Sequence, residues 1–342
     1  MSALLERPRL RGALLGLGGV ARQSHVPAYL LPQAAAHLEI VAAFDPSLHA
    51  TPVAGIPLVH ERAALADLDR LDFVDICTPT SSHLEHTLWA LEHGWHVLCE
   101  KPVALSRAEA EQIRAAALRA GRVVMPCHQY RFNPVWRRVK GWLESRAIGR
   151  WHLAEFEVYR LHADRGASAD STPWRARSAL SRGGILLDHG THLIYELLDV
   201  AGEPTSVRAW VGSLRHRDYE VEDSAHLLLE FPGRLARMFL TWAGHRRENR
   251  IRFIGDQGTI EWNGGMLTLE RDGCVERFDY SAELDKAAYP GWFADLFAAF
   301  AEAIDIGDTA PLDDIAAVAA VLDSAYASAV LPGSGLGAIG AA

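Results

Sequence analysis

Hydrophobic and polar residues alternate along the first 130 residues in blocks that predict strands separated by helices. Short apolar runs, typical of buried strands, occur at residues 9–17, 38–44, 73–77, 95–99 and 122–127. Helices are expected at 81–93 and 107–120, with Ser106 as an N-cap and Gly94 and Gly121 at the two helix ends. Strand–helix repeats of this kind predict a doubly wound parallel sheet that binds ligands at the carboxyl ends of its strands.

After about residue 128 the pattern changes to longer strands of alternating polarity. They are predicted at residues 151–159, 225–231, 235–243, 251–254, 258–262, 266–270 and 274–280. Glycine-containing turns join the last of them into an antiparallel meander, and two helices, 291–306 and 313–329, close the chain. We therefore expect one domain at residues 1–128 and a second at 129–342. With few helices, the second sheet should keep a free face, on which apolar residues would indicate a subunit interface.

Composition fits a soluble enzyme with a small-molecule substrate. The chain has 342 residues, enough for about two domains, and 49% of them are hydrophobic. A net charge of −9 argues against a nucleic-acid partner. No apolar stretch reaches the roughly 18 residues of a membrane span, and the N-terminus lacks a secretory pattern. The four cysteines lack C-x-x-C spacing, which favours reduced thiols and a cytoplasmic protein.

A glycine-rich turn follows the first predicted strand. Gly16, Gly18, Gly19, Val20 and Ala21 complete a G-x-G-x-x-A pattern, in which glycine permits a tight turn and lets backbone approach a pyrophosphate. Asp45 ends the next strand, where a carboxylate can accept hydrogen bonds from a ribose 2′-hydroxyl and would repel a 2′-phosphate. No arginine follows in residues 46–49. The turn therefore predicts NAD, in preference to NADP.

Lys101 stands out because lysine is rare in this chain. The sequence contains 31 arginines but three lysines, and Lys101 lies in Glu100-Lys101-Pro102, directly after a predicted strand. Arginine does not release a proton in proteins, whereas a lysine ammonium group can be tuned to do so. A chance lysine in a surface turn is the alternative. We interpret Lys101 as a catalytic residue.

A second polar group occurs at residues 183–192. If a helix follows Gly183-Gly184, Asp188 and His192 lie at i and i+4 on one face, and His189 lies about 100° away. An acid beside an imidazole suits proton transfer, because the carboxylate orients the ring and stabilises its charged form. Metal binding is less favoured, since no further ligand cluster is evident, and we expect no metal. A structural Asp–His pair is the remaining alternative.

Five segments of the chain together resemble one enzyme family. They are residues 16–21, 78–83 (TPTSSH), 100–102 (EKP), 128–134 (HQYRFNP) and the Gly-Gly…Asp188…His192 segment. The chain is similar to the glucose–fructose oxidoreductase/inositol dehydrogenase (Gfo/Idh/MocA) family over residues 10–330. The resemblance implies an N-terminal Rossmann domain and a C-terminal α/β domain with a large, mostly antiparallel open sheet that forms homodimers or homotetramers.

The resemblance also implies site residues. Lys101, Asp188 and His192 match the family's catalytic positions. Cofactor contacts are implied for Gly16, Gly18, Gly19, Val20, Asp45, Thr78, Pro79, His83, Glu100, Lys101 and Gln129. Trp174-Arg175 matches a segment near cofactor or substrate, and Tyr130 and Arg131 follow a strand end, so these four are predicted to bind substrate. The arginine-rich segment 160–182 fits either a solvated loop or a site for a carboxylate or phosphate.

The implied reaction is hydride transfer between NAD(P) and a hydroxyl carbon of a sugar, cyclitol or related polyol bound between the domains. His192 would take the hydroxyl proton, Lys101 would stabilise the oxygen, and Asp188 would orient the pair. Whether Lys101 or His192 is the formal base stays open, because interacting groups titrate as a unit. Three alternatives remain: a redox-neutral NAD-dependent glycosidase, an imine reductase and a non-catalytic NAD-binding regulator.

Overall fold

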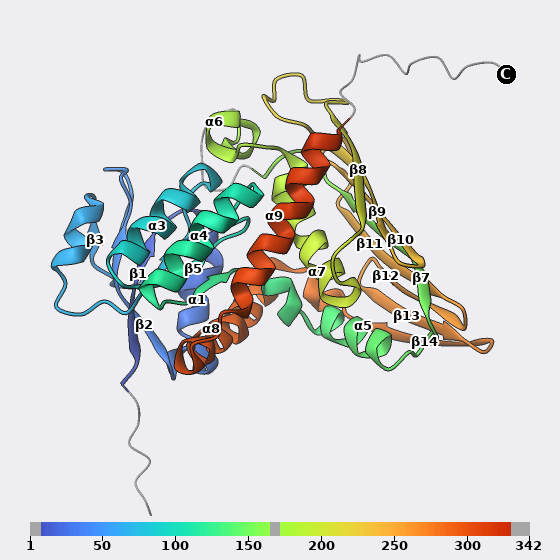
Figure 1. The fold of residues 1–342 in the computed structure, drawn as a ribbon, viewed down its shortest axis with the longest axis horizontal. Coiled ribbons are helices and arrows are strands. Elements are labelled where there is room, and N and C mark those ends of the chain that lie inside the picture. Colours follow the sequence, from blue (N-terminus) through green and yellow to red (C-terminus); the bar gives the residue numbers. More distant parts are fainter. Residues whose placement is uncertain (1–7, 165–171, 330–342) are drawn as a thin grey trace, which may run out of the picture. The chain divides into compact units, whose positions relative to one another are not determined.

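The computed structural model describes residues 8–164 and 172–329, which form two compact units. The first unit contains the chain up to Arg137 together with Ala282–Ala319. The second contains the chain from Arg138 to Ser281, apart from the undescribed segment, and the residues from Ala320 onward. Figure 1 shows one sheet in each unit.

The first unit is built on a six-stranded parallel sheet with the order β3-β2-β1-β4-β5-β6. Its strands are β1 (Leu10–Leu15), β2 (Leu38–Phe44), β3 (Leu58–Val59), β4 (Phe73–Ile76), β5 (His96–Cys99) and β6 (Val124–Pro126). The strand order reverses between β1 and β4, so their carboxyl ends border the crevice in which such sheets bind ligands. The predicted doubly wound fold is confirmed.

Helices cover both faces of this sheet. They are α1 (Val26–Tyr29), α2 (Pro32–Ala35), α3 (His83–Glu92), α4 (Arg107–Ala120), α8 (Tyr289–Ile306) and the first part of α9 (Ala310–Ser328). Helices α3 and α4 pack on one face with Leu312 and Ile315 of α9. On the other face, Phe297 stacks on Tyr29 and Phe300 contacts Phe73 edge to face, with ring centroids 4.3 and 5.6 Å apart.

Helix α8 and the start of α9 thus pack in the first unit, where the sequence prediction had assigned them to the second domain. Their apolar residues recur at helical spacing, which identifies a buried face but not the sheet that it covers. Helix α4 matches its prediction at both ends: Ser106 Oγ accepts a hydrogen bond from Glu109 N at 3.2 Å, and Gly121 adopts a φ of +61°.

The second unit contains an eight-stranded sheet with the order β14-β13-β12-β11-β7-β10-β9-β8. Its strands are β7 (Trp151–Tyr159), β8 (Ser206–Gly212), β9 (Ser224–Phe231), β10 (Arg234–Thr241), β11 (Glu248–Gly255), β12 (Gly258–Asn263), β13 (Met266–Arg271) and β14 (Cys274–Asp279). Strands β7 and β10 pair in parallel and the other neighbours are antiparallel. The predicted large, mostly antiparallel sheet is therefore confirmed.

One face of the second sheet is packed and the other is open. Along β7, Ala154, Phe156 and Val158 are buried, whereas Glu155 and Glu157 on the opposite face are half-buried. Helices α5 (Pro134–Glu144) and α7 (Thr191–Ala201) lie on the packed side (Figure 1). Within residues 8–164 and 172–329, no helix is long and apolar enough to cross a membrane.

Short helical turns complete the described chain. The 3-10 turns are Arg62–Asp67, Thr80–Ser82, Gln129–Phe132, Trp174–Ala176, Ser281–Leu284 and Lys286–Ala288, and α6 spans Ser178–Ser181. Two π-helical turns, η1 (Ala21–His25) and η6 (Leu186–Gly190), each precede an α-helix. Both lie in segments from which the sequence predicted chemistry.

Candidate active site

The glycine turn after β1 has the geometry that close backbone approach requires. Gly16 has a φ of +91°, and a Cβ at this position would lie 3.0 Å from the carbonyl carbon and oxygen of Cys77. A side chain there would therefore be strained as well as crowded. A Cβ at Gly18 would meet nothing within 4 Å, so the space beside this residue is open. Of the predicted cofactor residues, Gly16 shapes the turn and Gly18 leaves the room that a pyrophosphate needs.

Asp45, at the end of β2, ties the same turn to its own strand. Its Oδ2 accepts a hydrogen bond from Leu17 N, and its Oδ1 accepts one from Ser47 N, both at 2.9 Å. The side chain is half-buried. A carboxylate has about four acceptor positions, so a ribose hydroxyl could still be bound.

Arg22 was not predicted, yet it lies beside this end of the sheet. Its Nε donates to Leu17 O at 2.8 Å, and its Nη2 donates to Thr51 O. The prediction of NAD rested on the Asp45 carboxylate and on the absence of arginine in residues 46–49, but η1 supplies an arginine from the other side of the turn. The signal was present in the sequence, since Arg22 directly follows the glycine motif.

Gln129 also fits a role in ligand binding. It begins the 3-10 turn after β6 and is 5% exposed, and its Oε1 has no hydrogen-bond partner among the described residues. An unsatisfied buried amide oxygen is costly, which is typical of a position that a ligand completes. Together with the open space at Gly18 and the Asp45 carboxylate, the residues present fit a dinucleotide at this edge of the sheet.

Lys101 follows β5 and is linked to a buried polar network through Glu100. Glu100 Oε2 accepts a hydrogen bond from Lys101 N at 3.2 Å, and Glu100 Oε1 lies 3.0 Å from His25 Nε2. His25 Nδ1 lies 2.8 Å from Asp75 Oδ2, which also accepts a hydrogen bond from Tyr29 Oη. Glu100 was predicted to contact cofactor, and the structure places its carboxylate in this network.

The network holds a charged histidine. Burial lowers the pKa of His25, but the charge and hydrogen bond of the Asp75 carboxylate, together with the neighbouring Cys77, raise it overall to well above 6.5. Burial raises the pKa of Glu100, but the hydrogen bond and charge of His25, together with the charge of Lys101, lower it overall. His25 is therefore an imidazolium between two carboxylates. Sequence reasoning missed His25 and Asp75, although an aspartate inside the apolar run 73–77 was a signal.

A second histidine joins the chain segments on either side of Lys101. His83 is 2% exposed; its Nδ1 lies 2.8 Å from Pro102 O, and its Nε2 lies 2.9 Å from Thr78 O. It thus connects the segment after β4 to the segment after β5. His83, Thr78 and Pro79 were predicted cofactor residues, and the structure brings all three to the carboxyl ends of β4 and β5.

Tyr130 and Arg131 make contacts with the helices of their own unit. Arg131 forms a two-point ion pair with Asp314 of α9, in which Nη2 and Oδ1 are 2.9 Å apart. The Tyr130 ring contacts Trp292 of α8 edge to face, with centroids 5.6 Å apart. If Tyr130 and Arg131 bind substrate, as the sequence predicts, they would do so while keeping or exchanging these contacts with Trp292 and Asp314.

In the second unit, Gly183 and Gly184 permit close packing of backbone. A Cβ at Gly184 would lie 1.8 Å from Glu222 O, and one at Gly183 would lie 2.6 Å from Tyr326 Oη. Ile185 N donates to the same Glu222 carbonyl at 3.2 Å. The two glycines therefore fix the start of the following helical segment against its neighbours.

That segment is not the single α-helix that the sequence predicted. Residues Leu186–Gly190 form a π-helical turn, and α7 begins at Thr191. A π turn has i→i+5 hydrogen bonds, so the assumed angle of 100° per residue does not hold between Asp188 and His192. The structure thus corrects the simple i,i+4 picture.

Asp188 is brought together with Trp174 and Arg175. Its Oδ1 lies 3.2 Å from Arg175 Nε, and its Oδ2 lies 3.2 Å from His189 Nδ1. The Arg175 guanidinium also covers the Trp174 ring, with its Cζ 4.5 Å from the ring centroid. Three predicted site residues are therefore neighbours, although they come from segments 13 residues apart.

His192, the predicted base, is paired with a tyrosine. Its Nδ1 lies 2.8 Å from Tyr195 Oη, and the two side chains are 7% and 0% exposed. If Nδ1 carries the proton and donates to Tyr195, Nε2 is left with the lone pair that a general base needs. Tyr195 was missed; its spacing of three residues from His192 was the available signal.

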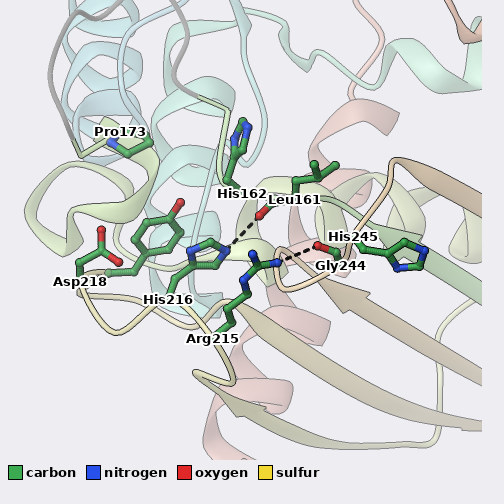
Figure 2. Close-up of a pocket in the computed structure, with 9 residues that line it drawn as sticks. Leu161, His162, Pro173, Arg215, His216, Asp218, Gly244 and His245 are labelled. Carbon is green, nitrogen blue, oxygen red and sulfur yellow. Dashed lines mark hydrogen bonds between the residues drawn. The ribbon is translucent and has the colours of Figure 1, made fainter.

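A polar pocket of about 480 Å³ lies in the second unit. It is lined by Leu161, His162, Pro173, Arg215, His216, Asp218, Tyr219, Gly244 and His245 (Figure 2). Arg215 Nη1 donates to Gly244 O at 3.1 Å, and His216 Nε2 faces Leu161 O at the same distance. None of the predicted site residues lines this pocket. Residues 165–171 of the arginine-rich segment lie outside the described chain.

Comparison with known proteins agrees with this architecture. Residues 10–128 match the model of an oxidoreductase family with an NAD-binding Rossmann fold, and residues 136–261 match the GFO/IDH/MocA C-terminal domain. D-glucoside 3-dehydrogenase from Escherichia coli is 29% identical over 301 residues, covering 78% of this chain and 83% of that protein.

Two further relatives extend the comparison. An NADP⁺-dependent scyllo-inositol 2-dehydrogenase from Bacillus subtilis is 28% identical over 174 residues, or 51% of this chain and 47% of its own length. An oxidoreductase from Agrobacterium radiobacter, solved with NAD⁺, L-tartaric acid and magnesium, has the same fold. Its TM-score is 0.79 at 22% identity, over 94% of this chain and 96% of that one. The chain belongs to the Gfo/Idh/MocA family of NAD-binding oxidoreductases.

Proposed function

We propose that this protein is an NAD-dependent dehydrogenase that oxidises a secondary hydroxyl group of a sugar, cyclitol or related polyol. The observation that carries the proposal is the position of Lys101, held directly after β5 by the Glu100 carboxylate, on the sheet whose glycine turn follows β1. Support also comes from relatives named as glucoside and inositol dehydrogenases. The inositol dehydrogenase is named as NADP⁺-dependent.

The nicotinamide cofactor, when bound, supplies the hydride acceptor. Lys101 would donate a hydrogen bond to the reacting hydroxyl oxygen and stabilise the negative charge that develops there. His192 would receive the hydroxyl proton at Nε2 while Tyr195 holds Nδ1. Asp188 would position Arg175, with which it forms an ion pair, for contact with substrate hydroxyls. The reverse reduction would use the same groups, with His192 as the acid.

NAD is the proposed cofactor, because Asp45 stands where a 2′-phosphate would be repelled. Its carboxylate is fixed by Leu17 N and Ser47 N, so it could not swing away from a phosphate without losing both bonds. Arg22 would favour a 2′-phosphate, but two backbone carbonyl groups already accept two of its five N–H donors and hold its orientation. We therefore expect NAD to be preferred by a moderate factor.

We also propose that the chain forms homodimers or homotetramers through the open face of the second sheet. This face carries Tyr159, Phe239 and His226, whose rings are neighbours, and the partly exposed Leu228. Phe239→Lys would place a charge among these rings. We expect light scattering after gel filtration to show a smaller assembly for this variant; an unchanged mass would exclude the face as the interface.

The function is tested by NADH formation at 340 nm with NAD⁺ and a panel of inositols, aldoses, D-glucosides and sugar acids. Wild type is compared with Lys101→Ala and with Lys140→Ala, a lysine of α5 that pairs with Asp199. Turnover that is lost in Lys101→Ala and kept in Lys140→Ala is the expected result. Equal turnover in both variants would contradict a catalytic role for Lys101.

A further inference from the structure

Lys101 lies between two histidine bridges. Before it, Glu100 contacts His25, whose other ring nitrogen contacts Asp75 of β4. After it, the carbonyl of Pro102 contacts His83, whose other ring nitrogen faces the carbonyl of Thr78. Both bridges link the carboxyl end of β4 to that of β5. The backbone on each side of Lys101 is therefore tied to the neighbouring strand.

His25 reaches this position because the helix after the glycine turn begins with a π turn. Val26 N donates to Ala21 O, five residues back, which closes the turn over Ala21–His25. Single π turns are uncommon and occur frequently at functional sites. The His25 ring packs against Phe293 and Phe297 of α8, with centroids 4.4 and 5.4 Å away. Water is thus excluded from the His25 ring, and the interactions of this ring with the two carboxylates are strengthened.

The Asp75–His25–Glu100 network has a net negative charge, which a neighbouring lysine can balance. The Asp75 and Glu100 carboxylates surround one imidazolium, so the group carries a net charge of about −1. A buried unpaired charge is costly. The ammonium group of Lys101 is the next cation along the chain, and its charge contributes to the lowered pKa of Glu100. The network and Lys101 are therefore electrostatically coupled.

We propose that the Asp75–His25–Glu100 network is a positioning device for Lys101. In this role His25 fixes Glu100 Oε1, so that Glu100 Oε2 holds the backbone N–H of Lys101 and its carboxylate faces the lysine in one orientation. His25 and Asp75 would touch neither substrate nor cofactor. The assignment rests on the proposed function only in taking Lys101 to be catalytic.

Metal binding is a weaker explanation of the same residues. Ligand-type atoms of His25, Asp75 and Cys127 lie within 4.8 Å of one another. Both ring nitrogens of His25 are, however, already directed at carboxylate oxygens at hydrogen-bond distance. A protonated imidazole has no lone pair for a metal. The hydrogen-bond geometry therefore favours a positioning network.

The test compares His25→Gln and Asp75→Asn with His96→Gln. His96 lies at the opposite end of β5 and accepts a hydrogen bond from Val123 N at 3.0 Å, so it controls for the loss of a histidine from the same sheet. The assay uses the substrate identified by NADH formation at 340 nm. We expect kcat to fall roughly tenfold to 100-fold in the two network variants, because small displacements of a catalytic group are that costly. KM for NAD should change less than about threefold, and His96→Gln should retain kcat.

A second readout does not depend on turnover. Because the chain has three lysines, protein labelled with ¹³C-lysine gives three sets of side-chain signals, and Lys101→Arg identifies one of them. We expect the Lys101 signal to shift and broaden in His25→Gln and in Asp75→Asn, a substitution that keeps the size of the side chain. The signals of Lys140 and Lys286 should not change. His96→Gln should leave all three unchanged.

The outcomes separate the two proposals. An unchanged Lys101 signal in both network variants would overturn the positioning role whatever the kinetics show. Equal losses of kcat in His96→Gln would also overturn it, since general destabilisation would then explain the effect. If wild type turns over no polyol while the Lys101 signal responds as expected, the proposed function fails and the positioning role stands.

Discussion

Two buried histidines beside Lys101 differ in charge because of what their ring nitrogens face. His25 faces two carboxylates, and its pKa is raised well above 6.5 despite burial. His83 faces two backbone carbonyl groups; burial lowers its pKa, and the two carbonyl dipoles only partly oppose this. Full charges outweigh the cost of burial where dipoles do not. One bridge is thus ionic. The other is neutral, and because a neutral imidazole has one N–H, His83 donates to one of its two carbonyl oxygens at a time.

Tyr195 provides a direct test of how His192 is oriented. Tyr195→Phe removes the hydroxyl that lies 2.8 Å from His192 Nδ1 and leaves that nitrogen without this contact. A hydrogen bond of this kind is worth about 1 kcal/mol, so we expect kcat to fall about fivefold with little change in KM for NAD. The measurement is steady-state kinetics beside Tyr159→Phe, which alters a tyrosine on the open face. Equal kcat values in Tyr195→Phe and wild type would refute the role.

Asp45 is expected to set the choice of cofactor. In Asp45→Asn the charge that would repel a 2′-phosphate is lost, and we expect the ratio of kcat/KM for NADP to that for NAD to rise about tenfold. Asp72→Asn is the control: its carboxylate also accepts a backbone hydrogen bond, from Arg11 N, but precedes β4. A ratio that moves equally in both variants would show that the change is structural.

At the scale of elements, the start of the Asp188 segment depends on the absence of a Cβ at Gly184. Gly184→Ala would place a methyl group 1.8 Å from Glu222 O, a backbone atom with little freedom to move. We expect the free energy of unfolding to fall by an amount near the upper end of the ~1–3 kcal/mol typical of overpacking. Gly141→Ala in α5 is the matched control, because its Cβ would meet nothing within 4 Å. Alanine there should stabilise the helix by about 0.5–1 kcal/mol. Urea midpoints followed by circular dichroism measure both.

Local signals explain why most elements could be predicted. Helix α4 is defined by Ser106 and Gly121, and the strands of the second sheet by alternating polarity and glycine turns. Helix α5 and strand β8 were not predicted, although the spacing of Val135, Trp136 and Val139 is helical. The two π turns could not be predicted, because one extra residue in a turn leaves no distinct pattern of polarity.

At the scale of the whole molecule, the sequence names candidate site residues but not the contacts that they make. Lys101, Asp188 and Arg175 carry recognisable chemistry, and the last two do meet. The link from His25 to Glu100 spans 75 residues and exists because β4 and β5 are neighbours in the sheet. Such pairings depend on strand order and on which buried groups find partners, and the sequence pattern records neither. The packing of α8 on the first sheet is unpredictable for the same reason.

Acid should destabilise the folded chain before its carboxylates titrate. The pKa values of His86 and His96 are lowered from 6.5 to about 4, first by burial and then by Arg62 and Arg122 respectively. Both accept a hydrogen bond at Nδ1 (from Arg62 Nη1 at 2.6 Å and from Val123 N at 3.0 Å), which protonation would break. Between pH 6.5 and 4 the unfolded chain therefore binds more protons than the folded chain, and the free energy of unfolding falls as pH falls.

His25 does not offset this loss. Below pH 6.5 the unfolded chain binds a proton at His25 with its ordinary pKa, and the raised pKa keeps His25 protonated in the folded chain as well. Its own contribution to stability therefore declines only as pH rises above 6.5. Because His86 and His96 are partly accessible to solvent, we expect each to contribute about 1–2 kcal/mol between pH 6.5 and 4. His96→Gln, whose amide oxygen can still accept from Val123 N, should lose that much less stability on acidification than wild type. Urea midpoints at pH 7, 5.5 and 4.5 measure the difference, with the exposed His49→Gln as control. A pH dependence in His96→Gln as steep as that of wild type would show that carboxylate titration alone governs the acid limit.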